Sequence, residues 1–239
     1  MHCGEDVMVL TEWGLSGVEA LRDQVAVFVI VDVFSFSTAV DVAVSNGAVV
    51  YPFRYGDEDA AQIAAERVGA VLAKPRRSSV GQFSLSPQSL TAVPAGLRIM
   101  LPSPNGARLS LACGDRPVLT GCLRNAAAVA KAARQIANGG SVGVVPAGER
   151  WPDGSLRPAI EDLLGAGAII HHLALTCSPE AEVALNAFRG ARDVGRLIRT
   201  SVSGRELIER GFASDVDLAV ELEVSMCAPL LAGGAYRAV

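Results

Sequence analysis

The sequence lacks the residue patterns on which several common kinds of site depend. Its five cysteines are scattered through 239 residues, with no Cys-x-x-Cys pair and no Cys/His cluster, so neither a disulfide framework nor a structural zinc site is expected. No cysteine is followed by an arginine six positions later, which excludes the cysteine nucleophile of the tyrosine phosphatases. Lysine occurs only at Lys74 and Lys131, which leaves few candidates for a lysine Schiff base.

The chain also lacks the features of nucleic-acid-binding and membrane proteins. Its formal charge is −4, it has no basic stripe, and aromatic residues that could stack on bases make up only 5% of it. The longest apolar runs, such as residues 25–31, are too short to span a bilayer, and the N-terminal residues have no signal-peptide pattern. We therefore expect a cytoplasmic protein whose partner is a small molecule.

Apolar residues, in contrast, make up 50% of the chain, which is enough for a well-buried core. The valine-rich run at 25–31 predicts a strand buried on both faces. Further strands are expected within residues 48–53, 97–103, 118–125 and 141–148, with helices over 37–45, 56–73, 106–113 and 126–140 between them, and with a long polar loop over 74–96. This alternation predicts an α/β fold of three layers, α/β/α, with a mainly parallel or mixed sheet.

The part of the chain after residue 176 is expected to be helical. Residues 203–222 predict a helix-turn-helix hairpin, with Ser203 or Gly204 before the first helix and Ser214 before the second. Just before this part, the GAGA segment at 165–168 is expected at the end of a helix. His171 and His172 are expected to follow an apolar strand, to point to opposite faces and to have a structural role.

One internal similarity is visible. Residues 39–53 and 159–173 match in apolar spacing, in Asp41 and Glu161, and in Gly47 and Gly167, at an offset of about half the chain. We interpret residues 1–239 as a single domain whose two halves are similar and intertwined, as two pseudo-repeats of about 120 residues would be. Each half would then contain a strand, a polar loop and a short acidic helix that stops at glycine.

Charged residues of both signs are concentrated at 146–170. The loop holds Glu149, Arg150, Asp153 and Arg157, and Glu161 and Asp162 follow in the expected first turn of a helix. Carboxylates and guanidinium groups together suit a site that holds a divalent cation and an oxyanion. The alternative is that the acids only complement the positive end of the helix and that the loop charges are solvated.

Three other loops also follow apolar strands. Asp32 could ligate Mg²⁺ or act as an acid or base, or could simply cap its loop. Hydroxyl and N–H groups near a helix start could bind a phosphate, and the candidates are Ser37, Thr38, Asn105, Gly106 and Arg108, with Asn125 in a similar position. In α/β sheets the ends of strands and the starts of helices form one site, so we expect these loops to meet.

These pieces together resemble the 2-phosphosulfolactate phosphatase family, also called ComB-like proteins. The matching segments, in order, are VDVFSFSTA at 31–39, PSPNGA at 102–107, GCLRNAAAVA at 121–130, PAGERWPDGSLRPAIEDLLGAGAII at 146–170 and SGRELIERGFASDV at 203–216. The resemblance implies an α/β/α fold with two similar halves, a requirement for Mg²⁺, and hydrolysis of a sulfonated phosphate ester in coenzyme M biosynthesis.

Two segments depart from the family pattern. The family carries Asp-Val-Leu-Arg where this chain has Asp32 to Ser35, so an arginine that could bind an anion is absent at Ser35. The family's Gly-Glu-Arg and Gly-Asn-Ser-Pro segments appear here as residues 74–76 and 84–87, with Pro75 in place of the glutamate and Leu85 in place of the asparagine. Arg76 or Arg77 is a candidate replacement for the lost positive charge.

The leading hypothesis is a Mg²⁺-dependent phosphatase that acts on a small anionic phosphate monoester, with 2-phosphosulfolactate as the substrate implied by the resemblance. The proposed catalytic residues are Asp32, Glu149 and Asp153; the metal ligands are Asp32, Glu149, Glu161 and Asp162; and the substrate-binding residues are Ser37, Thr38, Asn105, Gly106, Arg108, Asn125, Arg150 and Arg157. The alternatives are a phosphatase for a different phospho-acid and a non-catalytic protein that binds anions or acts as a scaffold. A homodimer is a common arrangement for such enzymes, although the sequence leaves the oligomeric state open.

Overall fold

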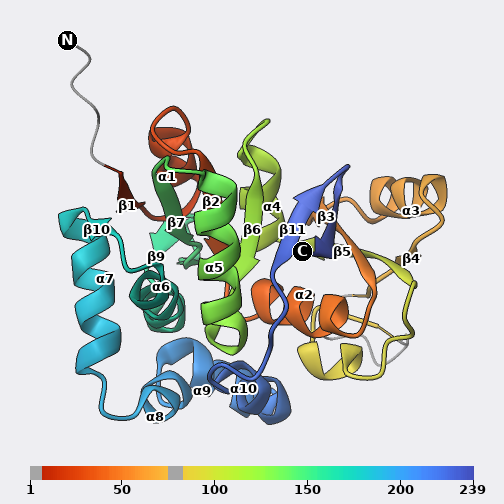
Figure 1. The fold of residues 1–239 in the computed structure, drawn as a ribbon. Coiled ribbons are helices and arrows are strands. Elements are labelled where there is room, and N and C mark those ends of the chain that lie inside the picture. The colour runs from red at the N-terminus through yellow and green to blue at the C-terminus, as the bar shows by residue number, and fades with distance from the viewer. Residues whose placement is uncertain (1–6, 75–82) are drawn as a thin grey trace.

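The computed structural model describes residues 7–74 and 83–239, and within them ten strands form one mixed sheet (Figure 1). Their order across the sheet is β10 (Thr176–Cys177), β1 (Met8–Thr11), β7 (Val142–Pro146), β2 (Val27–Val31), β6 (Val118–Gly121), β11 (Pro229–Ala232), β12 (Ala235–Ala238), β3 (Val49–Arg54), β5 (Arg98–Ser103) and β4 (Val71–Leu72). Neighbours are parallel from β10 to β6 and from β3 to β4, whereas β11 and β12 pair antiparallel with each other and with both groups. The prediction of a mixed sheet in an α/β fold is confirmed.

Helices lie on both faces of this sheet. They are α1 (Gly14–Leu21), α2 (Phe36–Ser45), α3 (Glu58–Arg67), α4 (Gly106–Ala112), α5 (Ala126–Ala137), α6 (Ile160–Leu173), α7 (Pro179–Gly190), α8 (Val194–Arg199), α9 (Val202–Glu209) and α10 (Ala213–Ala219), with short 3-10 turns η1 (Pro87–Leu90) and η2 (Leu123–Asn125). Figure 1 shows α5, α6 and α7 beside one another over the β2 end of the sheet. The arrangement is the three-layer architecture predicted from the sequence.

Strand β2 shows why the sequence specifies buried layers on both faces. Val27, Val29 and Val31 pack into the core beneath α5 and α6, whereas Phe28 and Ile30 pack with residues of α1 and α4 on the opposite face. All five residues of the strand are buried. A continuous apolar run rather than an alternating one is what a strand covered on both faces requires.

The prediction for residues 165–172 is wrong. The GAGA segment lies inside α6, not at a helix end, and no strand precedes the histidines. A Cβ at Gly165 would lie 2.8 Å from the Val33 side chain, and one at Gly167 would lie 2.2 Å from the backbone oxygen of Ala184. The glycines therefore allow close packing against the sheet and against α7 rather than ending the helix.

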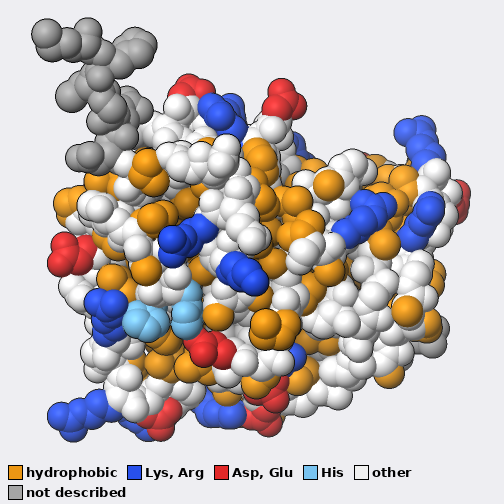
Figure 2. Space-filling view, viewed as in Figure 1, with side chains coloured by type: hydrophobic (Ala, Val, Ile, Leu, Met, Phe, Trp, Pro, Cys, Tyr) orange, Lys and Arg blue, Asp and Glu red, His pale blue; other side chains and the backbone are white. Residues whose placement is uncertain are grey.

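The two histidines lie in the last turn of α6, with ring centroids 5.1 Å apart. They form the pale blue pair on the surface in Figure 2. His172 contacts Glu223, and Arg189 donates to Nδ1 of His171 over 3.3 Å. They therefore lie side by side and do not point to opposite faces, because neighbouring residues on a helix diverge less than neighbours on a strand.

The helical prediction for the C-terminal part is correct up to α10 and wrong beyond it. Residues 229–238 form the β11–β12 hairpin, whose turn contains Gly233 and Gly234 with φ of 59° and 80°. Two consecutive positive φ angles suit the tight turn of a two-residue hairpin, which a Gly-Gly pair between apolar runs indicates. The predicted helix-turn-helix hairpin is present as α9 and α10, but the N-cap of α9 is Ser201, and Ser203 and Gly204 lie inside the helix.

Several boundaries also differ from prediction. Helix α2 begins at Phe36 after the N-cap Ser35, so Ser37 and Thr38 lie in its first turn. Helix α3 ends at Arg67, before β4. The similarity between residues 39–53 and 159–173 ends at the glycines, because α2 stops and β3 follows, whereas α6 continues to Leu173. The duplication itself stays a prediction.

No helix in the described part of the chain is both long and apolar enough to cross a membrane.

Candidate active site

Asp32, the first residue after β2, connects two of the loops that were expected to meet. Its Oδ2 accepts a hydrogen bond of 2.7 Å from the backbone N–H of Gly106, and its Oδ1 accepts one of 3.3 Å from Phe36 N. The loop after β5 reaches this position because residue 106 is glycine: a Cβ there would lie 2.4 Å from the Phe36 ring. The PSPNGA and VDVFSFSTA segments therefore lie against each other.

Asp162, in the first turn of α6, connects the loop after β2 to the loop after β7. Its Oδ1 accepts from Val33 N at 2.7 Å, and its Oδ2 accepts from Gly148 N at 2.8 Å. The side chain is only 3% exposed. Burial, followed by the negative charges of Asp32 and Glu161, raises the pKa of Asp162 well above its ordinary value. Two buried aspartates thus hold three loops together through backbone N–H groups.

Glu149 lies at the start of β8 (Glu149–Arg150), which pairs with β9 (Leu156–Arg157) in a small antiparallel ribbon. Its Oε2 accepts a hydrogen bond of 3.1 Å from Nδ2 of Asn105. Burial, reinforced by the charges of Asp32 and Glu161, raises the pKa of Glu149 to about 7, against the lowering effects of Asn105 and Arg157. A carboxyl group with such a pKa can exchange protons near neutral pH.

Glu161, the second residue of α6, is 1% exposed. Burial raises its pKa, whereas hydrogen bonds from Ser203 and Ser201 and the charge of Arg157 lower it. The Ser201 hydroxyl donates to Oε2 at 3.4 Å, and Oε1 has no hydrogen-bond partner among the residues that the structure describes. A buried carboxylate oxygen without a partner is costly unless another group binds it.

Glu149, Glu161 and Asp162 all have raised pKa values because burial disfavours their charged forms, and neighbouring carboxylates add to this effect at Glu149 and Asp162. Such a cluster attracts cations. Among the described residues, however, no group of three or more His, Cys, Asp or Glu side chains has the arrangement of a metal site.

The arginines of the charged loop lie around this cluster. The guanidinium group of Arg157 lies 3.5 Å from Oε2 of Glu206 on α9 and 5.6 Å from the centre of the Trp151 ring. Arg150 is exposed and donates from Nη1 to the backbone oxygen of Gly154 at 3.2 Å. Arg157 also acts electrostatically on both Glu149 and Glu161, so it is the arginine most closely associated with the acids.

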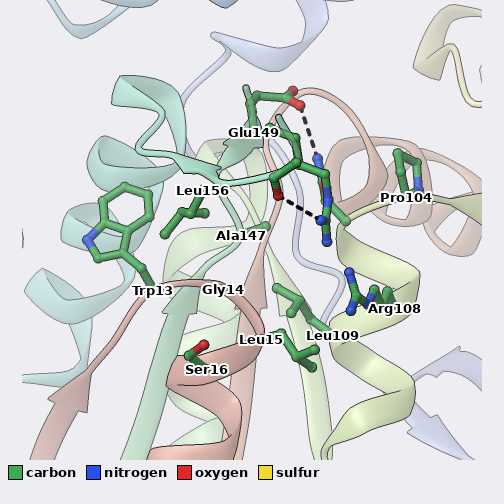
Figure 3. Close-up of a pocket in the computed structure, with 13 residues that line it drawn as sticks. Trp13, Gly14, Leu15, Ser16, Pro104, Arg108, Leu109, Ala147, Glu149 and Leu156 are labelled. Carbon is green, nitrogen blue, oxygen red and sulfur yellow. Dashed lines mark hydrogen bonds between the residues drawn. The ribbon is translucent and has the colours of Figure 1, made fainter. Parts of the chain in front are cut away.

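Two cavities share Glu149 and Arg150 in their walls. The first, of about 270 Å³, lies between the start of α1, the start of α4 and the β8–β9 ribbon. Figure 3 shows Glu149 beside it, with Pro104 and Arg108 on one side and Trp13 and Leu156 on the other. The second, of about 480 Å³, is lined by the ribbon, Phe34 and residues of α9. Glu149 is therefore reachable from two openings.

Other predicted site residues lie away from these cavities. Ser37 and Thr38 are fully buried, and their hydroxyls bond within the core: Thr38 donates to Val33 O, and Ser37 bonds to Asp32 N and to Thr120. Asn125 is also fully buried, and its Oδ1 accepts from Cys122 N at 2.9 Å. Their side chains thus hydrogen-bond to the backbone of the loops after β2 and β6.

Asp153 is exposed in the turn of the β8–β9 ribbon. Its Oδ1 accepts hydrogen bonds from the hydroxyl and the backbone N–H of Ser155, which lower its pKa. The structure thus brings together Asp32, Asn105, Gly106, Glu149, Arg157, Glu161 and Asp162, with Arg108 and Arg150 at the adjoining cavities, and leaves Asp153 outside this group.

Sequence reasoning missed the contribution of α9. Ser201 and Ser203 bond to Glu161, Glu206 pairs with Arg157, and Arg210 lines the second cavity. The signal was present, since SGRELIERGFASDV was one of the matching segments, but it was interpreted only as a helical hairpin. A further link joins this hairpin to the polar loop, because the Ser86 hydroxyl donates to Asp215 of α10.

Of the positions that depart from the family pattern, Ser35 is 2% exposed and is the N-cap of α2. Leu85 lies at a third cavity described below. Pro75, Arg76 and Arg77 lie outside the described residues.

Comparison with known proteins supports the resemblance. Residues 16–234 match the family model described as 2-phosphosulpholactate phosphatase. A probable 2-phosphosulfolactate phosphatase of Deinococcus radiodurans is 34% identical over 146 residues, which are 59% of this chain and 58% of that protein. One of Pseudothermotoga lettingae, also named as probable, is 28% identical over 213 residues, covering 85% of this chain and 88% of that protein.

A 2-phosphosulfolactate phosphatase of Methanothermobacter thermautotrophicus is 34% identical over 136 residues, or 57% of each protein. The chain thus aligns with less than two thirds of the Deinococcus and Methanothermobacter proteins and with most of the Pseudothermotoga protein. Because the family model spans nearly the whole sequence, the chain belongs to the 2-phosphosulfolactate phosphatase family.

Proposed function

We propose that the protein hydrolyses a small anionic phosphate monoester, with 2-phosphosulfolactate as substrate and sulfolactate and phosphate as products. The observation that carries this proposal is Glu149, a carboxyl group with a pKa of about 7 that lies beside Arg157, in a buried acidic cluster and in the walls of two cavities. The family match and the names of the relatives agree with the reaction.

In this proposal Glu149 is the general base. Its carboxylate accepts a proton from the water that attacks phosphorus, and the bond between phosphorus and the ester oxygen breaks. The leaving oxygen takes up a proton from bulk water, and Glu149 then releases its own proton to bulk water. A base with a pKa near the working pH is the most effective for such a transfer. Asn105 keeps the carboxylate in place through its hydrogen bond to Oε2.

Arg157 would bind the phosphate oxygens. Its guanidinium group is mostly buried, with 13% of the side chain exposed, and is oriented by Glu206 and Trp151. An oriented guanidinium group binds two phosphate oxygens at once and stabilises the charge that develops on them. Arg108, at the first cavity, is a second candidate for this contact.

Asp32 and Asp162 would act mainly as positioning residues. Each accepts backbone N–H groups from two different loops, so each fixes the spacing between the segments that carry Glu149, Asn105 and Glu161. Preorganisation of this kind reduces the cost of arranging the catalytic groups during the reaction.

The acidic cluster also fits a Mg²⁺ ion. The unpartnered Oε1 of Glu161 is the group that we expect to hold it, since Mg²⁺ in phosphate-processing sites is commonly bound through one or two carboxylates together with water and substrate oxygens. Such binding does not need three protein ligands. When bound, the ion would offset the negative charge of Glu161 and polarise the phosphoryl group.

The test is phosphate release by the purified protein from 2-phosphosulfolactate, with Mg²⁺ and after treatment with EDTA. We expect turnover that EDTA abolishes and Mg²⁺ restores. Turnover of other phospho-acids, but not of this one, would indicate a phosphatase with a different substrate. No turnover of any phospho-acid, together with a melting temperature raised by phosphate or sulfate alone, would indicate an anion-binding protein and would refute the proposal.

A further inference from the structure

The second cavity contains more positive than negative side chains. Arg150, Arg157 and Arg210 line it, against Glu149 and Glu206. The cavity, of about 480 Å³, therefore attracts an anionic ligand and has room for a small one.

The three arginines are not equally occupied. Arg150 donates to Gly154, and Arg157 contacts Glu206 and Trp151. Among residues 7–74 and 83–239, the guanidinium group of Arg210 has no hydrogen-bond or ion-pair partner. All N–H donors of its guanidinium group are therefore available to a ligand in this cavity.

Arg210 also lies at the boundary with a third cavity. As the C-cap residue of α9, it lines both the second cavity and a third one of about 570 Å³, whose wall also contains Arg54 and Lys74 and, of opposite charge, Asp57 and Glu58. Leu207, one turn earlier, belongs to both walls as well. Arg210 therefore lies where the second and third cavities adjoin, on the α9 side of the cavity that contains Glu149.

We propose that Arg210 determines substrate specificity: its guanidinium group binds an acidic group of the substrate other than the phosphate, the sulfonate or the carboxylate, when the phosphate lies at Glu149 and Arg157. This inference rests on the proposed function. It adds the residue that distinguishes a phosphate ester with further acidic groups from a phosphate ester whose other substituents are neutral. A planar guanidinium group pairs with two oxygens of a sulfonate or carboxylate. A site that holds such an anion discriminates strongly against a ligand that lacks it.

The experiment compares Arg210→Ala, Arg210→Lys and the control Arg205→Ala. Arg205 lies on the same helix and is exposed, but lines none of the three cavities. Each variant is assayed with 2-phosphosulfolactate and with glycerol 2-phosphate, in which neutral hydroxymethyl groups flank the phosphorylated carbon. Because Arg210 is exposed, its substitution should not affect folding, and the melting temperature verifies this.

For Arg210→Ala we expect the KM for 2-phosphosulfolactate to rise about tenfold or more, a loss of ~1.4 kcal/mol, with kcat changed less than about threefold. The KM for glycerol 2-phosphate should not change, Arg210→Lys should restore part of the loss, and Arg205→Ala should behave like the wild type. An unchanged KM for 2-phosphosulfolactate, or an equal rise for both esters, would overturn the proposal.

A binding measurement separates failure of this proposal from failure of the proposed function. Calorimetric titration with sulfolactate requires no turnover. We expect wild-type protein to bind it and Arg210→Ala to bind it about tenfold more weakly, whether or not the protein hydrolyses the phosphate ester. Equal affinity of the two proteins, or no binding by the wild type, would refute the role of Arg210.

Discussion

At Glu149 the effects that raise and lower a carboxyl pKa are both visible. Burial and the charges of Asp32 and Glu161 raise it, whereas Asn105 and Arg157 lower it, and the result is a pKa of about 7. The group is thus neither a permanently charged carboxylate nor a permanently protonated acid. Its protonation should affect both catalysis and stability.

We predict that Glu149 makes the metal-free protein less stable as the pH rises. Its pKa is about 7 in the folded state against an ordinary value of 4.5, so the folded protein binds the proton more tightly than the unfolded chain. The stabilisation from this proton is complete below pH 4.5 and is lost as the pH rises to about 7. Urea denaturation with EDTA across this range, on wild type and Glu149→Gln, measures it.

The expected result is a wild-type stability that falls with pH relative to that of the variant, since the other buried acids are common to both proteins. Added Mg²⁺ should reduce the difference. Parallel stability curves without metal would contradict the assignment of a raised pKa to Glu149.

The residues of the site that could be predicted from the sequence are those that follow strands or begin helices. Asp32, Asn105, Glu149 and Asp162 occupy such positions, and parallel strands place such positions close together. Ser203 and Arg210 could not be placed in this way. They belong to a helix that reaches the site only through tertiary packing, so hydrophobic periodicity and helix caps predict the helix but not its place at the site.

At the scale of elements, two glycines inside α6 led to a wrong prediction of where that helix ends. Gly165 and Gly167 suggested the end of a helix, because glycine is common there. In the structure the helix continues, and the space above each glycine is filled by Val33 or by the backbone at Ala184. Close contact between α6 and α7 is a property of the folded state, so a local pattern does not reveal it.

Gly167→Ala should therefore destabilise the protein. Its Cβ would lie 2.2 Å from a backbone oxygen of α7, and relief of this overlap requires the two helices to move apart. We expect a net loss of about 2 kcal/mol, because an overlap with backbone belongs at the upper end of the ~1–3 kcal/mol cost of overpacking and the better helix propensity of alanine returns somewhat less than ~1 kcal/mol. Denaturant unfolding measures the difference.

Gly190→Ala is the matched control. Gly190 is the last residue of α7, and no heavy atom lies within 4 Å of a Cβ placed there. This variant should be as stable as the wild type or more stable by up to ~1 kcal/mol. Equal effects of the two substitutions would show that close packing is not the reason for glycine at position 167.

At the scale of the whole molecule, the C-terminal hairpin joins the two parallel groups of the sheet within the described residues. β11 pairs with β6, and β12 pairs with β3. Tyr236 of β12 is fully buried, packs edge-on against Phe36, and donates to the Ser110 hydroxyl at 2.6 Å. Residues of β12 therefore pack in the same hydrophobic core as Phe36.

We predict that Tyr236→Ala destabilises the protein by ~3–5 kcal/mol, as large cavities in aromatic cores do, and that Tyr236→Phe costs only about 1 kcal/mol through the lost hydrogen bond. Tyr55→Ala serves as the control, because Tyr55 is 59% exposed. Thermal unfolding reports all three. A small effect of Tyr236→Ala would show that the hairpin is not required to hold the two groups together.

The overall architecture was predictable because strands and helices alternate over most of the chain. The hairpin was not, since PLLAGGAYRAV follows a long helical region, and its Gly-Gly turn is a short signal. Its position in the middle of the sheet depends on pairing with strands more than a hundred residues earlier in the chain. Pairing across such separations is not encoded in local periodicity.

The most direct test of the account is the rate of phosphate release from 2-phosphosulfolactate by wild type, Glu149→Gln and Glu209→Gln in the presence of Mg²⁺. Glu209 is an exposed glutamate at the end of α9 that lines none of the three cavities. We expect kcat to fall about 100-fold or more in Glu149→Gln and to be unchanged in Glu209→Gln, because of these two residues only Glu149 accepts a proton from water. A Glu149→Gln protein that releases phosphate at the wild-type rate would contradict it.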